Sequence, residues 1–214
     1  MELKKTSWND ITITDYKKIV EISKRELDTD LEKDIAVLAI LCNVKEADMY
    51  SMPLTELSAL LTSAEWIKKP YTFNHNFKPH KIKIGDKQYM VNPDLDKFTV
   101  AQYMDFQNFW DRRTEQMGNL LAVFIIPVGC KYNEGYDVLE LAQYLEDSLS
   151  ITFWNEVCFF FLQSYLTSIQ ASTLYSAYMM KKQIRMEKDK QKKQVLKEKY
   201  KELMKQVKKT LLIG

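Results

Sequence analysis

The sequence predicts a mainly α-helical protein: a helical bundle with one small β-hairpin at about residues 80–91 and a long basic C-terminal helix. Three observations support this fold class. Only 5 Gly and 5 Pro occur in 214 residues, and so few chain breakers favour long helices over a many-stranded sandwich. Helix-capping patterns recur along the chain. One short stretch alternates apolar and polar residues around a Gly-Asp turn, which is typical of a β-hairpin.

Residues 11–61 predict three helices. Thr14 is the expected cap of the first, which covers 11–26. A capping box that begins at Thr29 opens the second, and its later turns are apolar nearly all round. Asn43 is placed to end it. The third helix begins near Pro53, a residue that the first helical turn tolerates. The second helix is therefore expected at the centre of the core.

The β-hairpin is predicted from its alternation. A two-residue Gly85-Asp86 loop puts one set of side chains on an apolar face and another on a polar face. The apolar set is Ile82, Ile84, Tyr89 and Val91, and the polar set is Lys81, Lys83 and Gln88. An isolated two-stranded ribbon is marginal in water, so the apolar face should pack on helices. Lys81 and Lys83 then become candidate partner contacts.

The second half of the chain predicts further helices. Thr99 begins a capping box ahead of an aromatic-rich helix, and Asp137 caps a short one. The segment 119–127 either continues the aromatic helix or forms a buried segment of its own. A long apolar helix is expected over 150–180. These elements give a body at 1–180 and a basic amphipathic helix at 181–214.

Charge is divided unevenly along the chain. Residues 181–214 contain 13 Lys or Arg and 4 Asp or Glu, a net charge of +9, whereas residues 1–180 carry −7. Opposite charges on body and tail suit head-to-tail packing of an acidic surface against a basic helix in a homo-oligomer. We therefore count a second copy of the chain among the candidate partners.

Several classes of protein are disfavoured. Cys42, Cys130 and Cys158 are odd in number and widely spaced, which indicates buried free thiols rather than disulfides or a zinc site. The first ten residues contain no apolar signal core. The richest apolar run, 157–162, is six residues, whereas a bilayer span needs about 20. No membrane association is expected.

A metal or catalytic site is not expected either. Asn92, Asp94 and Asp96 imitate the start of a calcium loop, but Lys97 and Tyr103 occupy the positions that require Gly and Glu. We interpret this stretch as a turn and a helix start. His75 and His80 have no companion ligands or nucleophile motif near them, and the glycine spacing forms no phosphate loop. The predictions are no catalytic residue, no metal ligand and no cofactor, and therefore no enzyme.

The C-terminal helix carries the strongest functional signal. An apolar stripe with helical spacing runs along a lysine-rich segment. It consists of Leu196, Tyr200, Leu203, Val207 and Leu211. The stripe suits packing on the chain's own acidic body, docking on a partner protein, contact with nucleic acid, or contact with a membrane. The single Arg of the segment and its single aromatic disfavour nucleic acid, because phosphate forks and base stacking use those residues. Docking on a partner protein is the function we expect from these residues.

Several segments, taken in order, resemble small helical proteins of the structural-gene blocks of tailed bacteriophages, of the tail-assembly-chaperone or minor-virion-protein type. The segments are TITDYKKI, LAILCNVKEADMYSMPLTELSALL, KIKIGDKQYMVNPDLDKFTVAQYMDF and NLLAVFIIPVGCKYNEGYD. The resemblance covers roughly residues 11–180 and excludes the lysine-rich tail.

The resemblance implies a non-enzymatic role in virion or tail assembly, with other phage structural proteins as partners. It also implies a location in the host cytoplasm during assembly, or in the virion. The alternative is a protein that contacts nucleic acid through its basic helix, such as an internal or neck virion protein.

Overall fold

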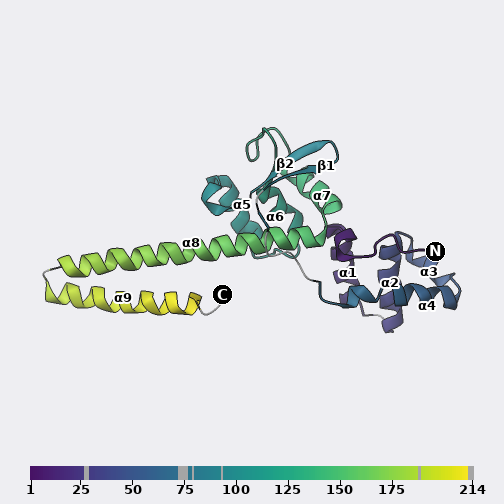
Figure 1. The fold of residues 1–214 in the computed structure, drawn as a ribbon, viewed down its shortest axis with the longest axis horizontal. Helices are drawn as coiled ribbons and strands as arrows, with labels where there is room; N and C mark the ends of the chain where they lie inside the picture. The colour runs from purple at the N-terminus through teal and green to yellow at the C-terminus, as the bar shows by residue number, and fades with distance from the viewer. Residues whose placement is uncertain (27–28, 72–76, 79, 93, 188, 212–214) are drawn as a thin grey trace. The chain divides into compact units, whose positions relative to one another are not determined.

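The protein is mainly α-helical with a small antiparallel sheet, as the computed structural model in Figure 1 shows. The structure describes residues 1–214 except 27–28, 72–76, 79, 93, 188 and 212–214. His75 lies outside the described residues. The chain divides into two compact units, Met1–Phe160 and Phe161–Gly214. We call the first the body and the second the helical hairpin. The sequence had suggested a division twenty residues later.

The N-terminal part of the body is a cluster of helices around α2. The elements are η1 (Trp8–Asp10), α1 (Ile13–Lys24), α2 (Asp30–Cys42), α3 (Glu46–Tyr50), α4 (Leu54–Ser63) and η2 (Glu65–Lys68). The predicted capping box at Thr29 is confirmed, because its hydroxyl accepts a hydrogen bond from the N–H of Glu32. Asn43 ends α2 in the left-handed conformation, at φ 56°. Leu38 and Leu41 of α2 are buried, so the helix is central as expected.

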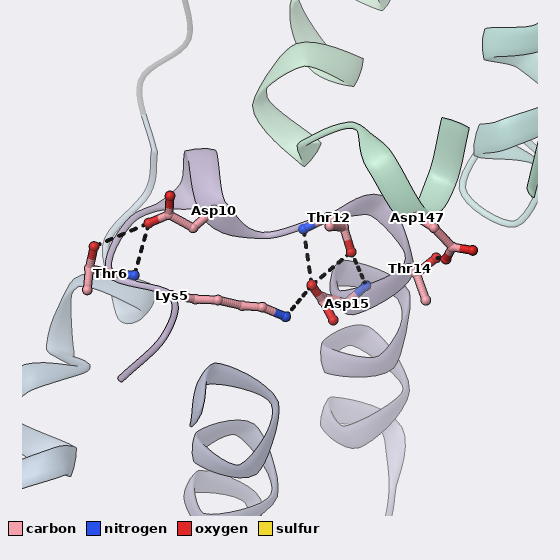
Figure 2. Close-up of polar contacts among 7 residues, drawn as sticks. All are labelled: Lys5, Thr6, Asp10, Thr12, Thr14, Asp15 and Asp147. Atoms are coloured by element: carbon pink, nitrogen blue, oxygen red, sulfur yellow. Dashed lines mark hydrogen bonds and ion pairs between the residues drawn. The ribbon is translucent and has the colours of Figure 1, made fainter. Parts of the chain in front are cut away.

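The first helix begins at a different threonine from the one the sequence suggested. Thr12 caps α1: its hydroxyl accepts from the N–H of Asp15, and the Asp15 carboxylate accepts in return from the Thr12 backbone. The prediction of Thr14 as the cap is wrong. The Thr14 hydroxyl instead donates to Asp147 Oδ1 over 2.5 Å, which ties α1 to a helix far along the chain (Figure 2).

The predicted β-hairpin is confirmed and gains a third strand. Strands β1 (Lys81–Ile84) and β2 (Lys87–Val91) pair antiparallel in the expected register, and β3 (Ile125–Pro127) adds to the far edge of β2. Tyr89 and Val91 are buried. Gly85 adopts φ 57°, which a two-residue turn of this kind needs at its first position. The segment that the sequence left open, 119–127, is therefore part helix and part strand.

Helices α5 (Val100–Trp110), α6 (Met117–Phe124) and α7 (Val138–Ser148) complete the body with the short η3 (Leu95–Lys97). The caps predicted at Thr99 and Asp137 are confirmed. Every residue of helix α6 except the half-buried Asn119 is buried. It touches α7 so closely that a Cβ on Gly118 would lie 2.5 Å from the Ala142 carbonyl oxygen. The Gly118 N–H donates to Glu146 Oε1 over 2.7 Å. Glycine is required here by the close helix approach.

A set of polar contacts connects the first seventeen residues to residues 146–152, and we call it the N-terminal clasp. In it, Lys17 pairs with Glu146, and a Lys5–Asp15 pair supports the N-terminal side from within. Figure 2 shows the Lys5–Asp15 pair beside the Thr12 cap and the Thr14–Asp147 bond. Backbone bonds continue it, since the Ile13 N–H donates to Leu149 and the Ile151 N–H donates to Ile11. The clasp therefore joins the N-terminal segment and α1 to the end of α7 and the start of α8 (Ile151–Met186).

The helical hairpin consists of two helices. Helix α8 (Ile151–Met186) begins in the body and continues into the second unit, and α9 (Lys190–Leu211) follows it. The predicted long helix is thus present and extends six residues beyond the expected end, to Met186. Asp189 starts α9, because its Oδ1 accepts from the N–H groups of Gln191 (2.8 Å) and Lys192 (3.1 Å). In Figure 1, α9 returns along α8.

Candidate interaction sites

The helical hairpin has a narrow apolar seam. On α8 the buried or half-buried residues Ala177, Met180 and Ile184 are three and four residues apart. On α9 the half-buried residues Lys193, Leu196, Tyr200 and Leu203 follow the same spacing. This is the pattern of an antiparallel two-helix coiled coil, in which every third or fourth residue faces the neighbouring helix.

The predicted stripe therefore lies on the seam as far as the structure describes it. Leu196, Tyr200 and Leu203 are half-buried. The side chains of Val207 and Leu211 lie outside the described residues. With the seam turned inward, α9 presents its lysines to solvent. The exposed lysines are Lys192, Lys197, Lys199, Lys201 and Lys205.

Few acidic residues of the hairpin can neutralise these lysines, since residues 181–214 contain 4 Asp or Glu against 13 Lys or Arg. Residues 161–180 contain no charged residue, so the unit 161–214 carries the full +9 and the body −7. Among the side chains that the structure describes in 161–214, no Lys or Arg forms an ion pair, and the ion pairs found all lie within residues 1–146. Lys193 instead donates to the Glu187 carbonyl at the end of α8 over 3.4 Å. The hairpin is a surface that favours an acidic partner.

A second face of α8 is also exposed, opposite the seam. It consists of Tyr175, Tyr178, Lys182, Arg185 and Met186, which fall within about a third of the helix circumference at 100° per residue. We call it the tyrosine face. Tyr175 is 65% exposed, Tyr178 64% and Met186 71%. Exposed Tyr and Arg side chains on one face are typical of binding surfaces.

A large cleft, which we call the α7 cleft, lies in the body. It lies between the β1–β2 turn, the segment that follows β3, and α7, and encloses about 870 Å³. Its apolar lining includes Tyr89, Leu141 and Val128. Tyr144 stands at its edge, with its ring centroid 6.5 Å from that of Tyr89 and its hydroxyl 3.0 Å from where a Gly85 Cβ would lie. Burial raises the pKa of the Tyr89 hydroxyl, and Tyr144 adds to this.

The charged groups of the cleft are mainly acidic. Asp86, Asp137 and Glu140 line it and are exposed, and Lys87 is the basic side chain among its lining residues. Asp137 also caps α7 through the N–H groups of Leu139 and Glu140. The sequence did not indicate this cleft. Its walls come from three segments separated by up to 60 residues, and only the fold brings them together.

The remaining candidates have structural explanations. The Asp94 carboxylate accepts from the Asp96 N–H over 3.2 Å and pairs with Lys97 at 3.2 Å, so the apparent calcium loop is a turn, as interpreted. His80 lies against Phe77 with a centroid distance of 5.2 Å. Among the described side chains, no three of His, Cys, Asp or Glu gather as a metal site would require. Lys81 and Lys83 are exposed on β1, on the face away from Ile82 and Ile84.

The cysteines are free thiols, and two of the three are buried. Burial raises the pKa of the Cys42 and Cys158 thiols, which keeps both in the unreactive protonated form at neutral pH. Cys130 is only half-buried and lines the α7 cleft. Within the described part of the chain, no helix combines the length and the apolar character that crossing a bilayer requires.

Comparisons with known proteins do not add to this picture: no family model, no curated protein and no solved structure matches the chain.

Proposed function

We propose that the protein is a non-enzymatic interaction component of tailed-phage virion or tail assembly, either a minor virion protein or a tail-assembly chaperone, that binds its partners through the helical hairpin. The observation that carries the binding role is the hairpin itself: a +9 unit whose described cations form no ion pair, with an exposed tyrosine face on α8. The phage context is supported by the resemblance of residues 11–180.

An acidic protein surface is the partner that best fits the hairpin. The lysines attract negative charge, and the tyrosine face offers aromatic and thioether area that needs an apolar counterpart. Double-stranded nucleic acid would use the lysines and leave that area exposed. A protein partner uses both features, so it is favoured.

Mass spectrometry of purified particles, combined with co-purification from infected cells, tests the proposal. A minor virion protein is expected in the particle at a fixed copy number, and a chaperone is expected only in complexes with unassembled structural proteins. A full-length variant with Lys197→Glu, Lys199→Glu and Lys201→Glu should lose those complexes. A variant with Lys24→Glu, Lys45→Glu and Lys69→Glu, three exposed lysines of the body, is the charge-matched comparison outside the hairpin. Absence from both particles and structural-protein complexes would refute the proposed role.

Contact with nucleic acid is the second candidate, favoured by the exposed lysines of α9. It predicts binding that weakens steeply as salt rises, because each neutralised phosphate releases a counterion. Fluorescence anisotropy with labelled DNA and RNA measures this on the full chain. Binding that is undetectable at low salt, or unchanged by the Lys197, Lys199 and Lys201 reversals, would remove this candidate.

A further inference from the structure

The tyrosine face and the α7 cleft are complementary in chemistry. The face presents two aromatic side chains with Lys182 and Arg185 beside them, and all four are exposed. The cleft presents an aromatic and aliphatic interior with Asp86, Asp137 and Glu140 around it. Aromatic rings pack favourably on other rings, and guanidinium groups bind carboxylates through paired hydrogen bonds. Each surface supplies what the other lacks.

Pairing of two helical hairpins with each other is disfavoured. Each hairpin carries +9, so a symmetric contact between two of them would bring like charges together. The same argument disfavours body against body, since each body carries −7. A contact between unlike units of two copies brings opposite charges together instead.

We infer that the tyrosine face of α8 in one copy of the chain binds in the α7 cleft of a second copy. Tyr175 and Tyr178 pack on the apolar lining near Tyr89 and Tyr144, and Lys182 and Arg185 meet Asp86 and Glu140. The contact is heterologous, so repeated use closes a ring or extends a filament. The inference deepens the proposed function, because it rests on binding through the hairpin and names one partner, the chain itself.

The size of the cleft indicates how strong the association between two copies should be. A volume of about 870 Å³ accommodates only a few side chains, so the contact is small, and small polar-rimmed contacts are weak and transient. We expect association in the micromolar range that weakens as salt screens the ion pairs.

Two charge-reversed full-length variants test the inference by sedimentation velocity on purified, nucleic-acid-free protein. The cleft variant carries Asp86→Lys and Glu140→Lys, and the face variant carries Lys182→Glu and Arg185→Glu. The wild type is expected to associate increasingly with concentration at low salt. Each variant alone should sediment as a monomer, because each lacks one half of the contact.

An equimolar mixture of the two variants is the decisive sample. The intact face of the cleft variant can bind the intact cleft of the face variant, and the reversed charges of the other two surfaces also complement each other. The mixture should therefore associate although neither variant does so alone. A chain that carries all four reversals should associate again, since both charges are exchanged. The pair Lys24→Glu and Lys45→Glu, exposed in the body outside the cleft, should behave as wild type.

The inference would be overturned if the wild type were monomeric at every concentration, or if either single variant still associated. It would also be overturned by a mixture that stays monomeric while both variants keep the wild-type circular dichroism and melting temperature. Association that appears only when nucleic acid is added would overturn it as well. A second full-length cleft variant, Tyr144→Ala, is a control for misfolding caused by the charge reversals. It removes packing in the cleft without adding charge, and it should also weaken association. A protein that is monomeric but still binds phage structural proteins through the hairpin would refute self-association alone and leave the proposed function standing.

Discussion

The body and the helical hairpin hold their helices together by different means. In the body, all but one residue of α6 is buried, and ion pairs and capping boxes satisfy many of the charges and helix starts. In the hairpin, Phe161 and Ala177 are the buried residues among the described side chains, and the seam is otherwise half-exposed. The lysines that flank the seam repel one another. The body is built to be stable alone, whereas the hairpin gains most from a partner.

The largest expected effect is on the closest helix contact of the body. Gly118→Val puts a branched side chain where even a Cβ would lie 2.5 Å from a backbone oxygen, and we expect a loss of about 3 kcal/mol or more in the free energy of unfolding, since α6 and α7 must separate. Chemical denaturation followed by circular dichroism measures it.

Gly129→Val is the matched control. Gly129 has φ 90° but no atom within 4 Å of its built Cβ, so only conformational strain of about 1–2 kcal/mol is expected. Equal losses in the two variants would mean that the α6–α7 approach is not the sensitive contact.

A pair of leucine truncations compares the two units directly. Leu120 in α6 is fully buried, and Leu120→Ala should cost about 3 kcal/mol, because the lost side chain leaves a cavity. Leu203 in α9 is half-buried, so Leu203→Ala should cost about 1 kcal/mol, and only in the hairpin. Hydrogen exchange resolved by segment separates the two effects. If Leu203→Ala also accelerated exchange in α6, the units would not be energetically independent.

The β-turn provides an intermediate effect. Gly85→Val forces a β-branched residue to φ 57° and brings its Cβ to 3.0 Å from the Tyr144 hydroxyl, so we expect a loss of about 1–2 kcal/mol in the body. Thermal unfolding checks this, with Gln88→Val as a β-branched substitution at an extended position nearby. Unchanged stability of the Gly85 variant would show that the turn can change its backbone conformation without cost, and that this wall of the α7 cleft can move.

The smallest effect concerns acid. The Asp10 carboxylate accepts the N–H groups of Thr6 (3.0 Å) and Ser7 (2.9 Å), which holds its pKa below the ordinary value. A lowered folded-state pKa means that the stabilisation is present above the ordinary value of about 3.9 and is lost as pH falls below it. Asp10→Asn should therefore lower the melting temperature slightly at neutral pH.

The difference in melting temperature between Asp10→Asn and wild type should decrease as the pH falls from neutral to below the pKa of Asp10 in the folded protein. At that pH the wild-type carboxyl is also uncharged. A series of melting curves over that pH range follows this difference. A difference that stayed constant would show that the charge of Asp10 contributes nothing.

Local features of the fold were predictable, and distant contacts were not. The caps at Thr29, Thr99 and Asp137 and the register of β1 with β2 follow from neighbouring residues, and each was predicted. Thr12 was missed although the sequence contains its signal, an acidic residue three positions on. Strand β3 was left open because three residues become a strand only by pairing with β2.

The candidate site shows the same division. The apolar stripe of α9 follows from helical spacing, but its seam depends on α8 ending at Met186 and α9 beginning at Lys190. The Glu and Lys residues of this stretch favour a continuous helix. Asp189 was the available signal, since it caps the next helix. The α7 cleft depends on contacts among segments far apart in the chain, so no local pattern indicates it.

The N-terminal clasp also bears on the order in which the chain folds during synthesis. It joins residues 9–17 to residues 146–152, and the Thr152 hydroxyl donates to Asn9 across 143 positions. The contacts of the N-terminal clasp can therefore form only after the start of α8 has left the ribosome. The basic helical hairpin is synthesised directly afterwards, so it leaves the ribosome when the clasp of the body has become able to form.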